Sequence, residues 1–334
     1  MTRTALSLVW LLSCVCLARA EAPRLGRADA PAKQPGAVRL ATYNLLNLFD
    51  DKDDPSLSGN EDDMSSVKQE SEKKGLSAAI RRLDADILAL QEIESYDALI
   101  EFREQHLKGL GYDHVVSIDV GAERGIEQAV LSRFPVKEAV VWPVISLHGV
   151  HPEKYGNEPN RYAGQPLDCR RSPLRVTIDV PSKDGSAPYT LTLFVVHHKS
   201  GRYNNYWREA EAAKFVEMIA DLEKADPSRN IAILGDFNAL EIDASVQTYF
   251  SHGMTDVLAP RKARDPLTTT HESGRAIDFI LVNPAFLKEI VPSSAFVLGT
   301  PVRPEGADYR TTPAPEGFAS DHLPVAVDFL PRDN

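Results

Sequence analysis

The chain has 334 residues, of which 43% are hydrophobic, and its formal net charge at pH 7 is −11. This length and hydrophobic content are enough for a large buried core, which excludes a disordered or fibrous chain. The acidic charge excludes attraction of the whole surface to nucleic acid or to an anionic membrane, so a polyanionic substrate would need a local basic patch or metal ions.

Residues 1–20 have the pattern of a cleavable signal peptide, with Arg3 before an apolar run and Ala18-Arg19-Ala20 after it. The apolar run is too short to span a bilayer. A lipoprotein signal ending at Cys14 is a weaker alternative, because it would cut the apolar run in half. We therefore predict cleavage after Ala20, a secreted or periplasmic protein, and no transmembrane segment in the mature chain.

Residues 21–37 are rich in Pro, Ala and Gly, and we expect them to form a flexible leader. No repeat or change of composition divides the remainder, so residues 38–334 are predicted to form a single domain. Loss of the signal peptide would leave Cys169 as the only cysteine. It cannot form an intramolecular disulfide, and stability must come from the core.

Short apolar runs bounded by turn residues recur along the domain and predict strands. Residues 65–83 and 208–224 have helical spacing instead. Many strands with few helices favour a mixed sheet or a sandwich with helices outside. Residues 147–172 show no periodicity, and we expect a functional or disordered loop. The apolar runs are VRLATYNLL, DILALQEIE, QAVLSRFPV, YTLTLFVVHH, NIAILGDFN, AIDFILVN and LPVAVDFL.

Polar residues gather where these runs end, and each alone has an ordinary structural explanation as a turn, a cap or a surface residue. The recurrence of carboxylates, amides and histidines at several strand ends has no such ordinary explanation. Asp278 lies inside its run, where a carboxylate is costly to bury unless a cation or donor compensates it. The residues at the strand ends are Asn44, Glu92, His197, His198, Asp236, Asn238, Asp321 and His322.

Carboxylate and amide oxygens without thiolates are ligands for a hard cation, namely Mg²⁺, with Mn²⁺ or Ca²⁺ as alternatives. Histidines beside such a cation suit metal-assisted attack of water on a phosphate ester. The sequence contains no serine hydrolase elbow, Walker loop or dinucleotide fingerprint.

The motifs YNLLN, LALQEIE, AVLSRFPV, VVHHKS, ILGDFNA, AIDFILV and SDHLPV, in this order, resemble the endonuclease/exonuclease/phosphatase superfamily. The resemblance runs from about Val38 to Leu330. It implies a DNase I-like two-sheet α/β sandwich with helices on the outer faces and an active site at one mouth between the sheets.

The resemblance also implies roles for individual residues. Glu92 resembles the main metal ligand, with Asn44 and Asp321 as further metal-site groups. Asp236 resembles the residue that positions or deprotonates the attacking water, and Asn238 resembles a phosphate or metal contact.

His322 resembles the histidine that contacts the scissile phosphate, oriented by the carboxylate that matches Asp278. Such a pair fixes the imidazole tautomer, which gives Asp278 a reason to lie inside its strand. Lys199, Arg171 and Arg175 are further expected phosphate contacts, although they could equally be solvated surface residues.

Several substrates stay open, because the superfamily acts on several phosphate esters. We expect a phosphodiesterase and favour a nuclease acting as a monomer without a protein partner. A sphingomyelinase-like or other lipid or small-molecule phosphate ester hydrolase is the alternative, and a non-catalytic binding module is the second alternative.

The adjacent histidines of LTLFVVHHKS cannot both face one site, because successive side chains of a strand point to opposite faces. His197 continues the uniformly apolar row Leu191, Leu193 and Val195, which is typical of a face between two sheets. The family pattern selects the same histidine. We predict that His197 is catalytic and that His198 is a packing residue.

Overall fold

The computed structural model describes residues 23–55, 57, 63–121, 124–182, 187–262 and 264–332. The predicted signal peptide, residues 1–20, lies outside these ranges. The helices are α1 Glu70–Leu83, α2 Tyr96–His106, α3 Asn205–Ala225, α4 Ala244–Ser251 and α5 Pro284–Leu287, with a 3₁₀ turn at Asp63–Ser66. The strands are β1 Val38–Leu48, β2 Ile87–Ile93, β3 His114–Ser117, β4 Glu127–Ser132, β5 Val136–Val140, β6 Ile145–Val150, β7 Lys154–Tyr155, β8 Glu158–Pro159, β9 Pro166–Cys169, β10 Leu174–Val180, β11 Tyr189–His197, β12 Asn230–Asp236, β13 Thr255–Asp256, β14 Asp278–Val282, β15 Phe296–Val297 and β16 Val325–Phe329.

Most of the strands form two six-stranded mixed sheets. The first has the order β15-β16-β1-β2-β4-β3, and the second has the order β13-β14-β12-β11-β10-β5. Each sheet has a parallel pair at its centre, β1 with β2 and β11 with β12. An antiparallel strand flanks each pair, β16 beside β1 and β14 beside β12.

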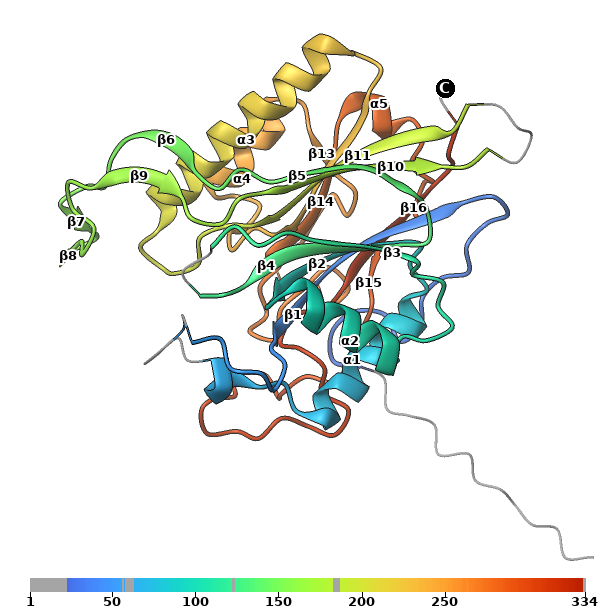
Figure 1. Ribbon diagram of the computed structural model, residues 1–334, viewed down its shortest axis with the longest axis horizontal. Coiled ribbons are helices and arrows are strands. Elements are labelled where there is room, and N and C mark those ends of the chain that lie inside the picture. The colour runs from blue at the N-terminus through green and yellow to red at the C-terminus, as the bar shows by residue number, and fades with distance from the viewer. Residues whose placement is uncertain are drawn as a thin grey trace, which may run out of the picture.

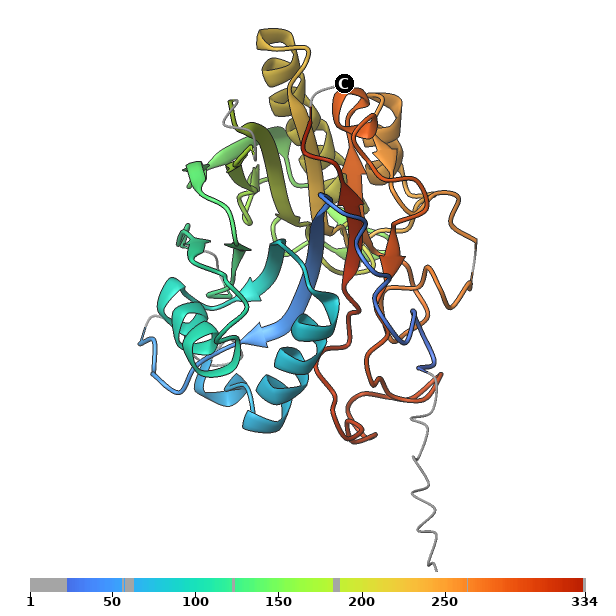
Figure 2. The ribbon, with the colours of Figure 1, turned by 90° about the vertical axis from the view of Figure 1, so that its right-hand side faces the viewer.

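The two sheets pack face to face, and helices cover their outer faces (Figures 1 and 2). α1 and α2 lie outside the first sheet, and α3 and α4 lie outside the second. Strand β11 shows how the sequence produces these layers. Leu191, Leu193 and Val195 belong to the core between the sheets, whereas Phe194 and Val196 pack under α3. The predicted two-sheet α/β sandwich with outer helices is confirmed.

The helices begin close to where the periodicity places them. The helix expected over 65–83 begins at Glu70, because the Gln69 backbone N–H is capped by the Glu72 side chain at 3.2 Å. The helix expected over 208–224 spans Asn205–Ala225 and buries Phe215 and Ile219. Among the described residues, no helix is long and apolar enough to cross a membrane.

The prediction of a flexible leader over 21–37 is wrong for the part that the structure describes, residues 23–37. Leu25 is buried, the Gly26 backbone N–H donates to the Pro266 carbonyl at 2.7 Å, and Lys33 forms an ion pair with Asp86 at 2.9 Å. The segment is therefore anchored to the sandwich by residues that are distant in sequence.

Residues 147–172 are also ordered. Strands β6 and β9 pair as an arm that projects from the sandwich, with the β7–β8 hairpin at its tip (Figure 1). The base of the arm is fixed because Leu147, Leu167 and Cys169 pack in the core that contains α3. The Cys169 thiol is free and buried, and burial raises its pKa.

Candidate active site

Strand register brings the predicted catalytic residues together. His197 at the end of β11 is the pairing partner of Asp236 at the end of β12, and Asp236 is the partner of Asp278 at the start of β14. The first sheet meets them through Asn44 of β1. Its side-chain Nδ2 donates to Glu92 Oε1 at 3.3 Å and to Asp236 Oδ2 at 3.2 Å. Residues from both sheets therefore share one mouth of the sandwich.

The carboxylate of Asp236 is buried and held by amide groups. Its Oδ1 accepts the Asn238 backbone N–H at 2.8 Å, and its Oδ2 accepts Asn238 Nδ2 at 3.0 Å. Burial raises the pKa of Asp236 to about 6, although the nearby His322 acts in the opposite direction. Gly235 is required just before it, because φ is +142° and a Cβ would lie 2.0 Å from the Val196 carbonyl oxygen.

His322 is clamped by Asp278. Its Nδ1 lies 3.0 Å from both carboxylate oxygens of Asp278, so Nδ1 carries the donated proton. The opposite nitrogen, Nε2, faces Asp236 Oδ2 at 3.8 Å. Burial alone would lower the pKa of His322, but the charges of Asp278 and Asp236 raise it well above its usual value. The Thr270 hydroxyl completes the clamp by donating to Asp278 Oδ2 at 2.6 Å.

Glu92 lies at a bulge in β2, where the pairing with β1 is irregular. Its φ of +62° is unusual for a residue with a side chain and is typical of functional sites. Its Oε2 accepts the Asn47 backbone N–H at 3.1 Å. The buried ammonium of Lys68 supports the opposing bulge by donating to the carbonyls of Leu45 and Leu46, each at 2.9 Å.

The two adjacent histidines lie in different layers. His197 Nε2 is 3.6 Å from Glu92 Oε1 and 3.6 Å from Asp236 Oδ2, so this residue faces the mouth. Burial and the nearby arginines hold the pKa of His197 well below its usual value. His198 instead contacts Glu211 of α3 at 2.9 Å and Tyr249 of α4 at 3.0 Å. This arrangement is the one that strand alternation predicts.

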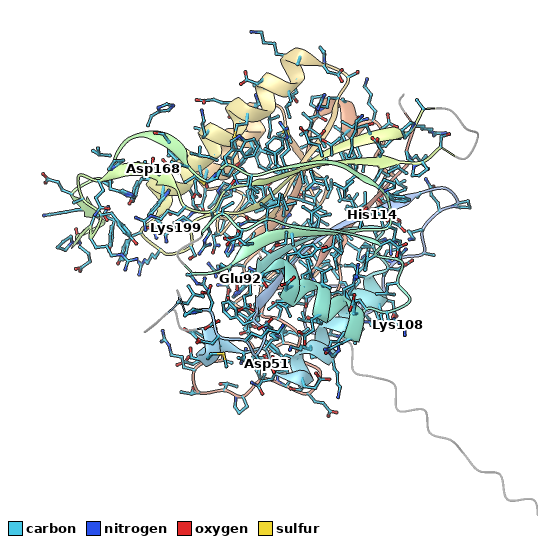
Figure 3. All side chains as sticks on the ribbon, viewed as in Figure 1. Asp51, Glu92, Lys108, His114, Asp168 and Lys199 are labelled. Carbon is cyan, nitrogen blue, oxygen red and sulfur yellow. The ribbon has the colours of Figure 1, made fainter. Side chains whose placement is uncertain are left out.

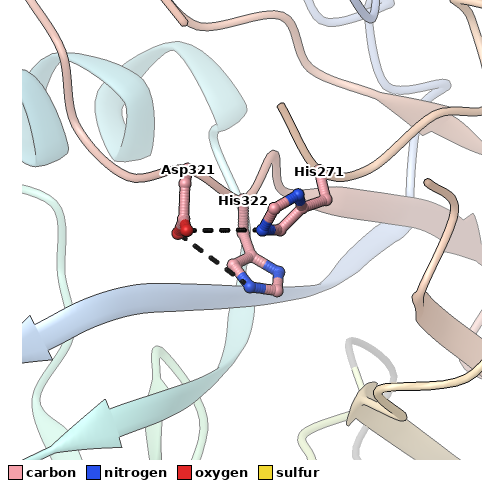
Figure 4. Close-up of side chains that lie close together, drawn as sticks. All are labelled: His271, Asp321 and His322. Atoms are coloured by element: carbon pink, nitrogen blue, oxygen red, sulfur yellow. Dashed lines mark ion pairs between the residues drawn. The ribbon is translucent and has the colours of Figure 1, made fainter. Parts of the chain in front are cut away.

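Asp321 is oriented by a residue that the sequence did not single out, His271. Because the Ser273 backbone N–H donates to His271 Nδ1 at 3.0 Å, the His271 proton lies on Nε2, which points at Asp321 Oδ2 from 3.3 Å (Figure 4). The rings of His271 and His322 pack edge to face at 4.7 Å. The only sequence signal for His271 is its position seven residues before Asp278.

Carboxylate oxygens at the mouth are ligands suited to a hard divalent cation. His271, Asp321 and His322 lie close together, as do Asp236, Asp278 and His322, with one candidate ligand atom from each residue within 4.8 Å of the others. Because His271 directs its Nε2 proton at Asp321, it orients that carboxylate and leaves the oxygens to a cation. The Oδ1 atom of Asp321 is buried and accepts no hydrogen bond from the described residues, which is what a metal-ligand oxygen requires. Of the predicted metal residues, Asn44 and Glu92 contact each other directly, and Asp321 lies beside His322.

Positive charge lies beside these carboxylates. Arg171 is buried and donates to the His198 carbonyl at 3.3 Å, the same oxygen that accepts Asn238 Nδ2 at 3.2 Å. Arg124, which the sequence did not single out, donates to Asn47 Oδ1 at 3.0 Å. Burial, and after it the charge of Arg124, lower the pKa of Arg171.

Lys199 lies at the same end of the sandwich as Glu92 and the arm residue Asp168 (Figure 3). Its Nζ lies 5.0 Å from the ring centroid of Trp207, within the range of a cation–π contact. Arg175, the other expected phosphate contact, pairs with Glu138 at 2.9 Å on the neighbouring strand. It belongs to the sheet surface.

A two-sheet α/β sandwich with buried carboxylates and histidines at one mouth defines the class of DNase I-like phosphoesterases. The sequence profile of the Endonuclease/Exonuclease/phosphatase family matches residues 41–322. The chain therefore belongs to this family, whose members hydrolyse phosphate esters and are typically dependent on divalent metal. A search of curated proteins gives no match.

Solved structures of low sequence identity share the fold. The human Nocturnin catalytic domain with bound sulfate is 14% identical, with 89% of this chain and 96% of that chain covered and a TM-score of 0.57. Truncated Caenorhabditis elegans TDP2 is 15% identical, with 88% and 97% covered and a TM-score of 0.53. The Bacteroides thetaiotaomicron mannosyl-6-phosphatase is 19% identical, with 87% and 98% covered and a TM-score of 0.53.

Proposed function

We propose that the protein is a metal-dependent phosphodiester hydrolase that uses activated water and that its substrate is nucleic acid. The position of His322 carries this proposal. Its Nδ1 is 3.0 Å from both oxygens of Asp278, and its Nε2 faces the mouth and Asp236 at 3.8 Å. An imidazole held in this way keeps its Nε2 proton available for an oxygen of the phosphate ester.

Asp236 accepts the proton of the attacking water in this mechanism. Its pKa of about 6 makes it a stronger base than an ordinary aspartate and matches it to work near neutral pH. Asn44 and Asn238 fix the carboxylate by hydrogen bonds. His197 presents Nε2 to the same space and can donate to a non-bridging phosphate oxygen.

Asn44, Glu92 and Asp321 would hold the divalent cation, Mg²⁺ in the first instance, with Mn²⁺ or Ca²⁺ as alternatives. When bound, the cation supplies Lewis-acid stabilisation of the charge that develops on the phosphate. The protein's own contribution is orientation. His271 directs Asp321, and the Asn47 backbone N–H holds Glu92.

Two observations favour nucleic acid over a lipid. Arg171, Arg124 and Lys199 supply beside the mouth the local positive charge that an acidic protein needs to hold a polyanion. Neither tryptophan that the structure describes is a fully exposed side chain of the kind that anchors a protein at a membrane, since Trp207 is fully buried and Trp142 is half-buried.

The test is a substrate panel with the purified protein in Mg²⁺ or Mn²⁺. DNA and RNA oligonucleotides and bis(p-nitrophenyl) phosphate should be cleaved, and EDTA should stop cleavage. His322→Ala should lower kcat by about 10²–10⁴-fold. His252→Ala is the matched control, because His252 pairs with Glu223 at 2.8 Å, outside the proposed catalytic cluster. Hydrolysis of lipid or sugar phosphates without cleavage of nucleic acid would overturn the proposed substrate.

We also propose that the protein is exported. The pattern of residues 1–20 supports this, and cleavage after Ala20 would give a mature N-terminus at Glu21. Intact-mass measurement of the protein recovered outside the cytoplasm of a secreting host should give the mass of residues 21–334. Recovery of the full-length chain inside the cell would refute export.

A further inference from the structure

A cavity lies near the chain segments that carry Asn238 and Asp278. It has a volume of about 360 Å³ and is lined in part by Leu240, Ile242, Arg275 and Ala276. Its size is within the range of small-molecule pockets. Leu240 is 37% exposed and Ile242 is 80% exposed, so neither side chain is needed to complete the core. The cavity therefore has apolar groups that are free to pack against a ligand.

The chain connects this cavity directly to the catalytic residues. Leu240 follows Asn238 by two residues, at the mouth end of β12. Ala276 precedes Asp278 by two residues, at the mouth end of β14. The loop that joins β13 to β14 stands out from the side of the sandwich (Figure 2). A group in the cavity would thus be a neighbour of a phosphate held at Asp236 and His322.

Arg261 also lines the cavity and is held in place by its neighbours. Its side chain is only 3% exposed, its Nε is bound by Asp256, and its Nη2 donates to the Asp278 carbonyl at 3.0 Å. Its Nη1 is buried and has no acceptor among the described residues, and the guanidinium lies over the Phe279 ring at 4.1 Å. Arg261 therefore forms part of the wall of the cavity and offers no exposed donor to a ligand.

The rim of the cavity is positive although the protein is acidic. Lys262 and Arg264 are exposed and make no ion pair with any residue that the structure describes, and Arg275 lies beside them. Glu241 is the one carboxylate among the residues that line the cavity. A ligand that matches this cavity has an apolar face and a negative charge beside it.

We infer that the cavity binds the nucleobase of the nucleotide next to the scissile phosphate, and that Lys262 and Arg264 hold the phosphate beyond it. This inference rests on the proposed nuclease function. A nucleobase has apolar ring faces, and a phosphate follows it in the chain. Because Leu240 and Ala276 each lie two residues from a proposed site residue, the substrate strand itself is the favoured occupant.

The test uses the full protein with Mg²⁺ and a set of oligonucleotides in which one base at a time is replaced by an abasic residue. For the wild type, base removal at one position beside the cleaved bond should lower kcat/KM about tenfold. In the double variant Leu240→Ser/Ile242→Ser, the same base removal should have little further effect. Leu287→Ser is the matched control, because Leu287 is 41% exposed and lies in α5, at the other end of β14.

Charge is tested separately. Lys262→Glu/Arg264→Glu should lower kcat/KM for oligonucleotides about tenfold more than for bis(p-nitrophenyl) phosphate, which has no flanking nucleotide, and should reduce the salt dependence of binding. Lys288→Glu, at the residue that follows α5, is the control. The nucleobase assignment fails if base removal and the Leu240/Ile242 variant reduce kcat/KM independently. It also fails if Ile242 is needed instead for binding to anionic phospholipid vesicles.

Failure of the proposed function gives a different result. If the wild type cleaves bis(p-nitrophenyl) phosphate but no oligonucleotide, nucleic acid is not the substrate. Calorimetric titration with 5′-mononucleotides in EDTA then tests, independently of catalysis, whether the cavity binds a nucleobase. Binding that Leu240→Ser/Ile242→Ser weakens about tenfold supports a nucleobase cavity, and absence of binding by the wild type refutes it.

Discussion

Replacing Asp278 by asparagine removes the charge opposite His322 while nearly preserving shape. His322 Nδ1 lies 3.0 Å from both carboxylate oxygens in a buried setting. Two unit charges about 4 Å apart attract by about 4 kcal/mol at an effective dielectric constant of about 20, which corresponds to about 10³-fold in rate. Asparagine keeps one acceptor oxygen, so we expect kcat of Asp278→Asn to fall about 10²–10³-fold.

The assay is steady-state hydrolysis of bis(p-nitrophenyl) phosphate in Mg²⁺, with thermal unfolding measured in parallel. Asp328→Asn is the matched control. Asp328 is an equally buried carboxylate paired with Arg39 at 2.7 Å, at the end of the first sheet remote from the mouth. Asp328→Asn should lower stability without lowering kcat. A kcat for Asp278→Asn within about threefold of the wild type would refute the role given to the Asp278–His322 pair.

Three further predictions concern other side chains. His197→Ala should lower kcat by at least about tenfold more than His198→Ala. His198→Ala should mainly lower the melting temperature, because His198 packs against α3. The reverse order would mean that the two histidines have been assigned wrongly. His271→Ala should weaken Mg²⁺ affinity about 10–100-fold in titration calorimetry through loss of its contact with Asp321, whereas His271→Gln should recover part of it. Burial raises the pKa of Glu94 to about 7, so the folded state binds this proton more tightly than the unfolded chain does. The stability that the protonated side chain contributes is present below about pH 4.5 and is lost as the pH rises through about 7. The melting temperature of Glu94→Gln should therefore fall less between about pH 5 and about pH 8 than that of the wild type.

Local pattern was sufficient to predict which way His197 faces and that Asp278 has a partner. Alternation in β11 assigns His197 to the space between the sheets, because the row of apolar residues before it must face the inter-sheet core. Asp278 could be recognised because a carboxylate inside an apolar run needs a compensating partner, which proves to be His322. These inferences depend only on one strand and its two faces.

Contacts made by loops could not be predicted in the same way. His271 reaches Asp321 because the backbone N–H groups of Thr270 and His271 both donate to the Arg275 carbonyl and form a turn. Hydrophobic periodicity does not predict this turn. The segment from residue 23 is anchored by Leu25, whose partners lie far along the chain. Composition alone had indicated a flexible leader there.

The density of positive charge in the sequence did not predict which arginines lie at the active site. The segment CRRSPLR suggested several phosphate contacts. Arg171 precedes β10 and is buried beside the mouth, whereas Arg175 lies within β10 and points at Glu138 across the neighbouring strand. Which face an arginine reaches depends on the strand boundary and on the partner strand, and neither can be read from charge density.

The most direct test of the proposed chemistry is the rate of bis(p-nitrophenyl) phosphate hydrolysis by the wild type and by Glu92→Gln, each with Mg²⁺ and with EDTA. We predict that the wild type hydrolyses the diester only with Mg²⁺ and that Glu92→Gln loses at least about 10²-fold in kcat/KM while keeping its melting temperature within a few degrees. Hydrolysis that survives EDTA, or that Glu92→Gln leaves unchanged, would contradict a metal-dependent phosphodiesterase built on this mouth of the sandwich.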